Sequence, residues 1–189
     1  MPLNLPNLLT WLRIVLIPVF VFLFYLPHGW LDAHLLNLSA AAIFGAAAVT
    51  DWLDGYLARA LNQTSSFGAF LDPVADKLMV AAALIVLLQL GRVDGFIALI
   101  IIGREIAISA LREWMAGAGQ GKSVAVAFVG KIKTASQMIA ILLLLYFEPF
   151  LGLPIYRIGT WLIYVAAVLT IVSMVYYMAQ AARSESLQK

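Results

Sequence analysis

The sequence of 189 residues contains no cysteine, and only 12% of its residues are charged. Without cysteine the chain has neither disulfides nor thiolate metal sites, so a bound metal must be held by oxygen or imidazole ligands. Its two histidines, His28 and His34, lie in one short segment far from the acidic motif described below. A zinc site is therefore not expected, and oxygen ligands favour Mg²⁺ or Mn²⁺.

The scarcity of charge accompanies a very apolar chain, of which 63% is hydrophobic. A soluble domain cannot bury so much apolar surface, so the bilayer is the expected solvent. Six continuous apolar stretches are each long enough to span as a helix. They do not alternate in hydrophobicity as the strands of a membrane barrel do. The stretches are residues 8–26, 36–60, 72–90, 96–115, 124–147 and 156–179.

These stretches predict an all-α, polytopic membrane protein with six transmembrane helices. The connectors between them are short and no repeat is evident, so residues 1–189 are expected to form a single transmembrane domain. Membrane lipids are the expected surroundings, and no nucleic-acid partner is expected.

The distribution of Lys and Arg predicts the orientation. Ten of the twelve lie at one set of predicted helix ends, and only Arg92 and Arg157 lie at the other. This bias places both termini, and the loops after the second and fourth spans, on the cytoplasmic side of the inner membrane. Some of these cations can instead belong to a cytoplasmic site. The ten are Arg13, Arg59, Lys77, Arg104, Arg112, Lys122, Lys131, Lys133, Arg183 and Lys189.

Two pairs of aspartates flank the connection between the second and third stretches. Asp51 and Asp54 are three residues apart at the end of the second stretch, and Asp72 and Asp76 are four apart at the start of the third. Either spacing places both members of a pair on one helix face. An isolated aspartate here could equally be a helix cap, and Asp72 before a proline resembles one.

The polar residues 62–66, together with Gly68, predict a turn that brings the two acidic pairs to one depth. Two unit charges about 4 Å apart repel by about 4 kcal/mol at an effective dielectric of 20, so positive charge is needed among them. Two divalent ions held by such carboxylates form a clamp for displacement at phosphorus. Gly55 and Ala58 leave room for a ligand beside the first pair, and Arg59 suits a phosphate oxygen.

The complete pattern resembles the signature of the CDP-alcohol phosphatidyltransferase family at every fixed position. It reads Asp51-x2-Asp54-Gly55-x2-Ala58-Arg59-x8-Gly68-x3-Asp72-x3-Asp76. The resemblance implies that Asp51, Asp54, Asp72 and Asp76 bind two Mg²⁺ or Mn²⁺ ions, with Asp76 also the general base. It further implies that Gly55, Ala58, Arg59 and Gly68 accommodate the donor, CDP-diacylglycerol, and that the protein is a homodimer.

Other cations bear on the alcohol that accepts the phosphatidyl group. The fourth and fifth stretches carry basic residues, and the first carries polar residues at intervals of three. A basic pocket beside the metals suits sn-glycerol 3-phosphate, which carries nearly two negative charges. The segments PNLLTWLRI, GREIAISALREW and GKIKT also resemble bacterial family members that use this acceptor. The predicted acceptor-phosphate residues are Arg104, Arg112, Lys131, Lys133, Asn7, Thr10 and Arg13.

Several alternatives remain at this point. The basic residues could be topological anchors, or ion-pair partners of Glu105 and Glu113. A family member that makes cardiolipin from phosphatidylglycerol would need fewer cations, because that acceptor carries only a phosphodiester. A cation transporter would place acids near mid-bilayer on broken helices, with inverted repeats. A membrane prenyltransferase also uses aspartate pairs, but more spans would be expected.

Overall fold

The computed structural model describes residues 5–27, 29–60, 66–117 and 128–186. For residues 5–7, 54–60, 66–67, 69, 112, 115–117, 128–131 and 180–186 it describes the backbone alone. The described part of the chain is helical and contains no β-sheet. Its helices are α1 (Leu5–Leu23), α2 (Ala33–Ala60), α3 (Ser66–Gln89), α4 (Gly95–Gly117), α5 (Phe128–Tyr146) and α6 (Ile155–Ser186).

The prediction of an all-α fold is confirmed, and each predicted stretch corresponds to one helix. The start of the third helix was predicted wrongly. Helix α3 begins at Ser66, so Gly68 lies in its first turn and is no part of the preceding turn. Asp72 and Pro73 lie inside the helix, which rules out Asp72 as an N-cap. Both acidic pairs therefore belong to continuous helices.

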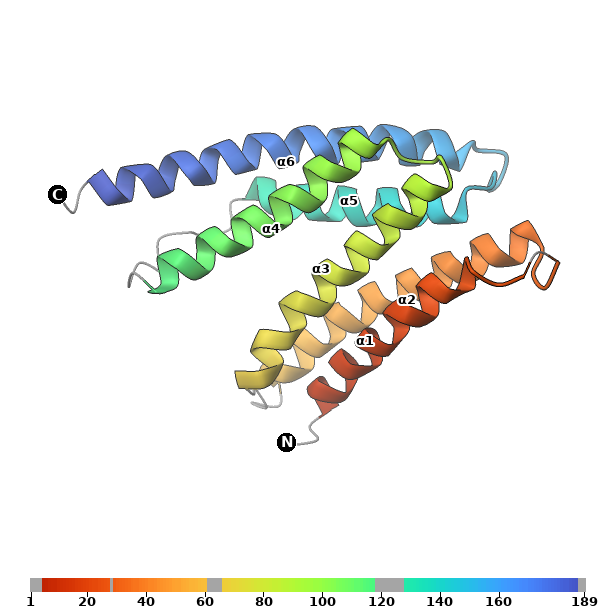
Figure 1. Cartoon of the computed structure of the whole chain (residues 1–189), viewed down its shortest axis with the longest axis horizontal. Helices are drawn as coiled ribbons and strands as arrows, with labels where there is room; N and C mark the ends of the chain where they lie inside the picture. The colour runs from red at the N-terminus through yellow and green to blue at the C-terminus, as the bar shows by residue number, and fades with distance from the viewer. Residues whose placement is uncertain (1–4, 28, 61–65, 118–127, 187–189) are drawn as a thin grey trace.

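The six helices run alternately in opposite directions (Figure 1). The connectors that follow α1, α3 and α5 lie together at one end, on the right of the view, and we call it the connector end. The most extensive contact is between α5 and α6, while α1 packs broadly on both α2 and α3. Direct contact between α2 and α3 is slight. Helix α1 is thus the main element joining those two helices.

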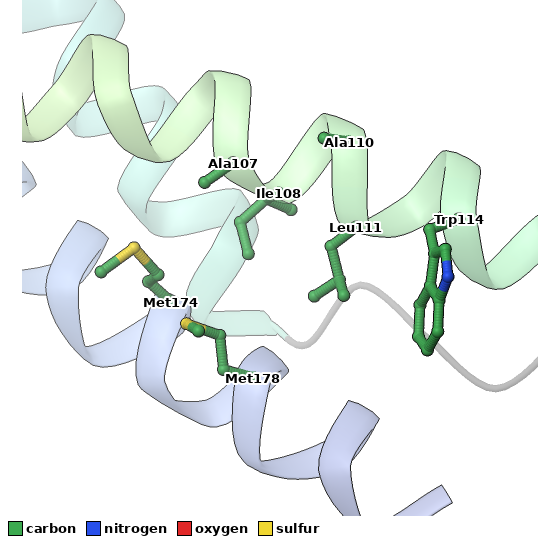
Figure 2. A pocket seen from close by; sticks show the side chains of 7 residues that line it. All are labelled: Ala107, Ile108, Ala110, Leu111, Trp114, Met174 and Met178. Carbon is green, nitrogen blue, oxygen red and sulfur yellow. The ribbon is translucent and has the colours of Figure 1, made fainter. Parts of the chain in front are cut away.

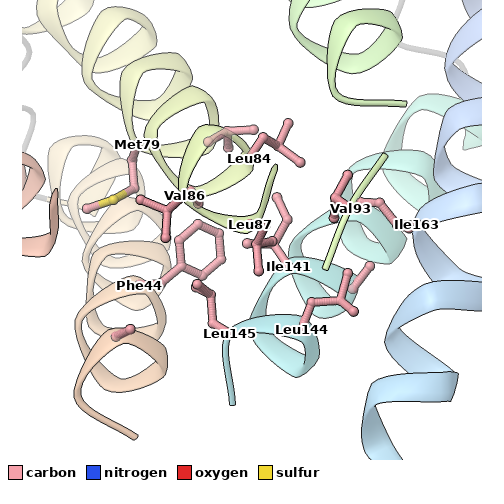
Figure 3. Packing of buried hydrophobic residues seen from close by; sticks show 14 of the residues in the cluster. Phe44, Met79, Leu84, Val86, Leu87, Val93, Ile141, Leu144, Leu145 and Ile163 are labelled. Carbon is pink, nitrogen blue, oxygen red and sulfur yellow. The ribbon is translucent and has the colours of Figure 1, made fainter. Parts of the chain in front are cut away.

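The apolar core contains side chains from all six helices, and Figure 3 shows the part to which α2, α3, α5 and α6 contribute. Phe44, Leu87 and Ile141 are almost completely buried there, as are Leu144 and Leu145 near the C-terminal end of α5. These side chains pack closely in the interior of the bundle. Most of the buried charged side chains lie toward the other end of the helices. The core therefore leaves that end for polar chemistry.

Arg92, in the connector between α3 and α4, ties the connector end together. Its Nη1 donates to the carbonyl oxygens of Leu144 and Leu145, each at 3.0 Å, in the last turn of α5. Its Nη2 donates to Asn37 Oδ1 on α2 at 2.8 Å. The guanidinium also lies 4.1 Å from the centre of the Phe147 ring. Arg92 thus satisfies helix-end carbonyls that would otherwise lack a partner.

The outer surface of the bundle is largely apolar, with Trp161, Val168 and Val172 among its many exposed large side chains. By length and hydropathy, two segments of the described helices are able to cross a bilayer, Ala33–Leu53 and Ile155–Ala179. Only 28% and 33% of these two segments, respectively, are buried inside the bundle, as expected for helices that contact lipid. Six membrane spans remain a prediction.

Candidate active site

Polar side chains from all six helices lie in the half of the bundle away from the connector end, and several of them are buried. They form two groups that the sequence does not place next to one another. The first, which we call the carboxylate cluster, consists of Thr10, Arg13, Asp51 and Asp72. The second, which we call the cation cluster, consists of Arg104, Glu105, Lys133 and Ser173.

In the carboxylate cluster, α1 holds one acid from each predicted pair. Arg13 Nη1 lies 2.8 Å from Asp51 Oδ1 on α2. One helical turn earlier, Thr10 Oγ1 donates a hydrogen bond to Asp72 Oδ1 on α3. Arg13 and Thr10 are each only 1% exposed, whereas the Asp51 side chain is 44% exposed. The carboxylates therefore face the accessible side of the cluster, and their partners lie beneath them.

Asp76, the last acid of the signature, is influenced by charges from both clusters. It is one turn after Asp72 on α3 and is partly buried. The charges that act on it most strongly are those of Asp51, Arg13, Glu105 and Lys77. Asp76 is therefore within electrostatic range of acids and cations from both clusters.

The cation cluster is centred on a single carboxylate oxygen. Glu105 Oε1 lies 2.5 Å from Lys133 Nζ on α5 and 3.1 Å from Arg104 Nη1. Arg104 Nη2 also donates to Ser173 Oγ on α6 at 3.4 Å. Lys133 is 1% exposed and Arg104 is 9% exposed. Two buried cations share one carboxylate, so this group carries a net positive charge.

The structure places some of the predicted acceptor residues apart. Arg104 and Lys133 meet in the cation cluster, as partners of Glu105. Thr10 and Arg13 instead contact the carboxylate cluster. Gly68 is buried in the first turn of α3. The side chains of seven other predicted site residues lie outside the described part of the chain: Asn7, Asp54, Gly55, Ala58, Arg59, Arg112 and Lys131.

Glu105 was not among the predicted site residues, although both cations of the cation cluster pair with it. A glutamate within an apolar helix, beside Arg104, was a signal that a buried ion pair was needed. The spacing of three between Thr10 and Arg13 correctly indicated one helix face. The sequence did not reveal the partners of that face, because they lie on two other helices, α2 and α3.

The donor atoms of the carboxylate cluster are of the kind that Mg²⁺ and Mn²⁺ prefer. The contact with Arg13 involves Oδ1 of Asp51, and the contact with Thr10 involves Oδ1 of Asp72. Each carboxylate therefore has a second oxygen that no described contact occupies. Among the residues whose side chains are described, no three acidic or histidine side chains converge closely enough to surround an ion. The ligand atoms are therefore of the right chemical kind for these metals. Because the side chain of Asp54 is outside that set, the complete ligand geometry stays a prediction.

An apolar groove of about 320 Å³ lies between α4 and α6, beyond the cation cluster (Figure 2). Ile108, Leu111 and Trp114 line it from α4, at intervals of three residues that continue the face of Arg104 toward the C-terminal end of the helix. Met174 and Met178 line it from α6. The groove has the chemistry for an acyl chain and offers no polar group for catalysis.

A family model described as CDP-alcohol phosphatidyltransferase matches residues 3–172. The chain belongs to the CDP-alcohol phosphatidyltransferase family. The match includes α1 to α5 and more than half of α6, so it contains the whole carboxylate cluster and all of the cation cluster except Ser173. The family is associated with membranes, in agreement with the apolar exterior and the two long apolar segments.

Curated relatives extend this similarity to the full length. The chain is 48% identical to the CDP-diacylglycerol-glycerol-3-phosphate 3-phosphatidyltransferase of Escherichia coli strain K12, over 192 aligned residues that cover 100% of both proteins. The protein of the same name from Shigella flexneri is also 48% identical, with the same coverage. No large insertion or missing helix separates this phosphatidyltransferase from these relatives.

Proposed function

We propose that this phosphatidyltransferase transfers the phosphatidyl group of CDP-diacylglycerol to sn-glycerol 3-phosphate, which releases CMP and yields phosphatidylglycerophosphate. The observation that carries the proposal is the 48% identity, over the whole chain, to relatives whose name states this donor and acceptor. The family signature supports the donor, and the positive charge of the cation cluster supports a phosphorylated acceptor.

The donor half of the site is proposed to be the two aspartate pairs. Asp51, Asp54, Asp72 and Asp76 would hold two Mg²⁺ or Mn²⁺ ions, which supply stabilisation of the negative charge on the diphosphate. Gly55, Ala58, Arg59 and Gly68 would accommodate the CDP part of the donor. The hydrogen bond from Thr10 and the ion pair with Arg13 support this assignment, because they hold Asp72 and Asp51 in defined positions.

The proton transfer is assigned to Asp76. Its carboxylate accepts the proton of an acceptor hydroxyl while that oxygen forms a bond to the phosphorus of the phosphatidyl group. The bond between this phosphorus and the bridging oxygen of the diphosphate breaks, and CMP leaves with the electron pair. The proximity of Asp76 to charges of both clusters supports the role, because the base must reach an acceptor held on the side of α4 and α5.

The acceptor phosphate is proposed to bind on the cationic side of the site, near Arg104, Arg112, Lys131 and Lys133. The net positive charge around Glu105 supports this placement. Asn7 on α1 remains a candidate for the same pocket. The protein is further proposed to be a homodimer with six spans in the inner membrane. Its termini and active site would face the cytoplasm.

An acceptor assay tests the proposal. Purified protein in lipid nanodiscs is given CDP-diacylglycerol with a labelled phosphatidyl group and one alcohol at a time: glycerol 3-phosphate, phosphatidylglycerol, serine or inositol. Phosphatidylglycerophosphate should form only with the first. A variant with Asp76→Asn is the control that the product arises from this site. Formation of cardiolipin from phosphatidylglycerol instead would overturn the proposed acceptor and keep the donor.

A further inference from the structure

Helix α1 packs against both of the helices that carry the acidic pairs. Asp51 and Asp54 belong to α2, and Asp72 and Asp76 belong to α3. These two helices contact one another only slightly, whereas α1 packs broadly on each of them. The distance between the two acidic pairs is therefore determined mainly by how each helix packs on α1.

Two buried side chains of α1 make that connection at the level of the acids. Thr10 contacts Asp72 from the second pair, and Arg13 contacts Asp51 from the first. Because they are three residues apart on one helix, Thr10 and Arg13 share a face. Each is only 1% exposed, so neither side chain lies at the accessible surface of the site. A polar group buried this deeply is costly unless its contacts hold it in place.

We propose that Thr10 and Arg13 are positioning residues, which fix the separation of the two acidic pairs and thereby set the affinity of the site for divalent cations. The inference rests on the proposed function, since it assumes that the four aspartates hold the metals. It replaces the expectation from the sequence that these two residues bind the acceptor phosphate. Arg13 also compensates the charge of Asp51.

Removing the Thr10 hydroxyl should weaken metal binding. A hydrogen bond to a charged group is typically strong enough for its loss to change an equilibrium by about tenfold to a hundredfold. Thr10→Val keeps the shape of the side chain and leaves Asp72 free to turn away from Asp51. Thr10→Ser keeps the hydroxyl and should restore binding. The matched control is Thr160→Val on α6, because the Thr160 hydroxyl donates to the carbonyl of Tyr156 in its own helix.

The measurement is binding of Mn²⁺ to the full-length protein in nanodiscs, followed by the loss of the electron paramagnetic resonance signal of free Mn²⁺. Thr10→Val should raise the dissociation constant at least tenfold, while Thr10→Ser and Thr160→Val stay within about twofold of the unmodified protein. If Thr10→Val does not fold, as judged by thermal unfolding, Arg13→Lys replaces it. This variant keeps the charge of Arg13 but loses its planar fork, and it should weaken binding severalfold.

The possible outcomes separate this inference from the proposed function. Unchanged Mn²⁺ affinity in a folded Thr10→Val variant, with a raised KM for glycerol 3-phosphate, would overturn the positioning role and support a contact with the acceptor. Absence of Mn²⁺ binding in the unmodified protein would overturn both the positioning role and the two-metal chemistry. Weaker Mn²⁺ binding with rescue by Thr10→Ser supports the inference, whichever alcohol the acceptor assay identifies.

Discussion

Replacing Glu105 with glutamine tests whether the cation cluster depends on its single carboxylate. The substitution preserves the size of the side chain and removes its charge. Lys133, at 1% exposure, and Arg104, at 9%, would then share no carboxylate. Breaking a buried ion pair by removing one partner costs about 3–5 kcal/mol, because an uncompensated charge stays buried. We expect Glu105→Gln to lower the free energy of unfolding by an amount in this range.

The free energy of unfolding can be measured by titrating the protein in mild detergent micelles with a denaturing detergent and following its helical circular dichroism signal. Glu113→Gln is the matched control, since Glu113 is on the same helix but exposed. Surface substitutions of this kind usually change stability by no more than about 0.5 kcal/mol. Any larger loss for Glu105→Gln is then attributable to burial of the cations.

A double-mutant cycle tests whether the ion pair between Glu105 and Lys133 accounts for the loss of stability. Lys133→Met removes the buried ammonium while keeping an unbranched side chain, so Glu105→Gln should cost less in the Lys133→Met background than in the unmodified protein. Contacting residues in one ionic network couple by about 0.5–3 kcal/mol. A loss below about 1 kcal/mol for Glu105→Gln, or strictly additive effects of the two substitutions, would refute the reasoning that Glu105 compensates Lys133.

Three further predictions concern the reaction. Excess EDTA should abolish turnover and added Mg²⁺ or Mn²⁺ should restore it; full activity in EDTA would contradict the two-metal assignment. Asp76→Asn should lower kcat by about 10²- to 10⁴-fold, because a general base acts in the transition state; a change confined to KM would contradict this role. Arg112→Ala should raise the KM for glycerol 3-phosphate by about tenfold to a hundredfold with little change in donor binding, because a charge-assisted contact is lost. An unaltered KM in active Arg112→Ala protein would return Arg112 to the role of a topological anchor.

Much of the fold was predictable because its causes are local. Each long apolar stretch forms one helix, and the short polar connectors reverse the chain, so six antiparallel helices follow from hydrophobicity and length. The acidic signature was equally local, since all eight of its residues lie between Asp51 and Asp76. The start of α3 was missed because a proline after Asp72 is typical of a helix N-terminus, whereas the helix begins at Ser66 and includes Pro73 about two turns later.

The sequence by itself therefore determined the six helices, their likeness to one family and the four aspartates, because spacing along a helix is enough to place these residues on a face. The tertiary structure decided what each face contacts. Only the packing of α1 on both α2 and α3 could assign Thr10 to Asp72 and Arg13 to Asp51. Likewise, only the meeting of α4 with α5 could join Glu105 to Lys133. The physical reason is that a buried charge selects its partner by proximity in space, and residues from different helices become neighbours only when the bundle packs.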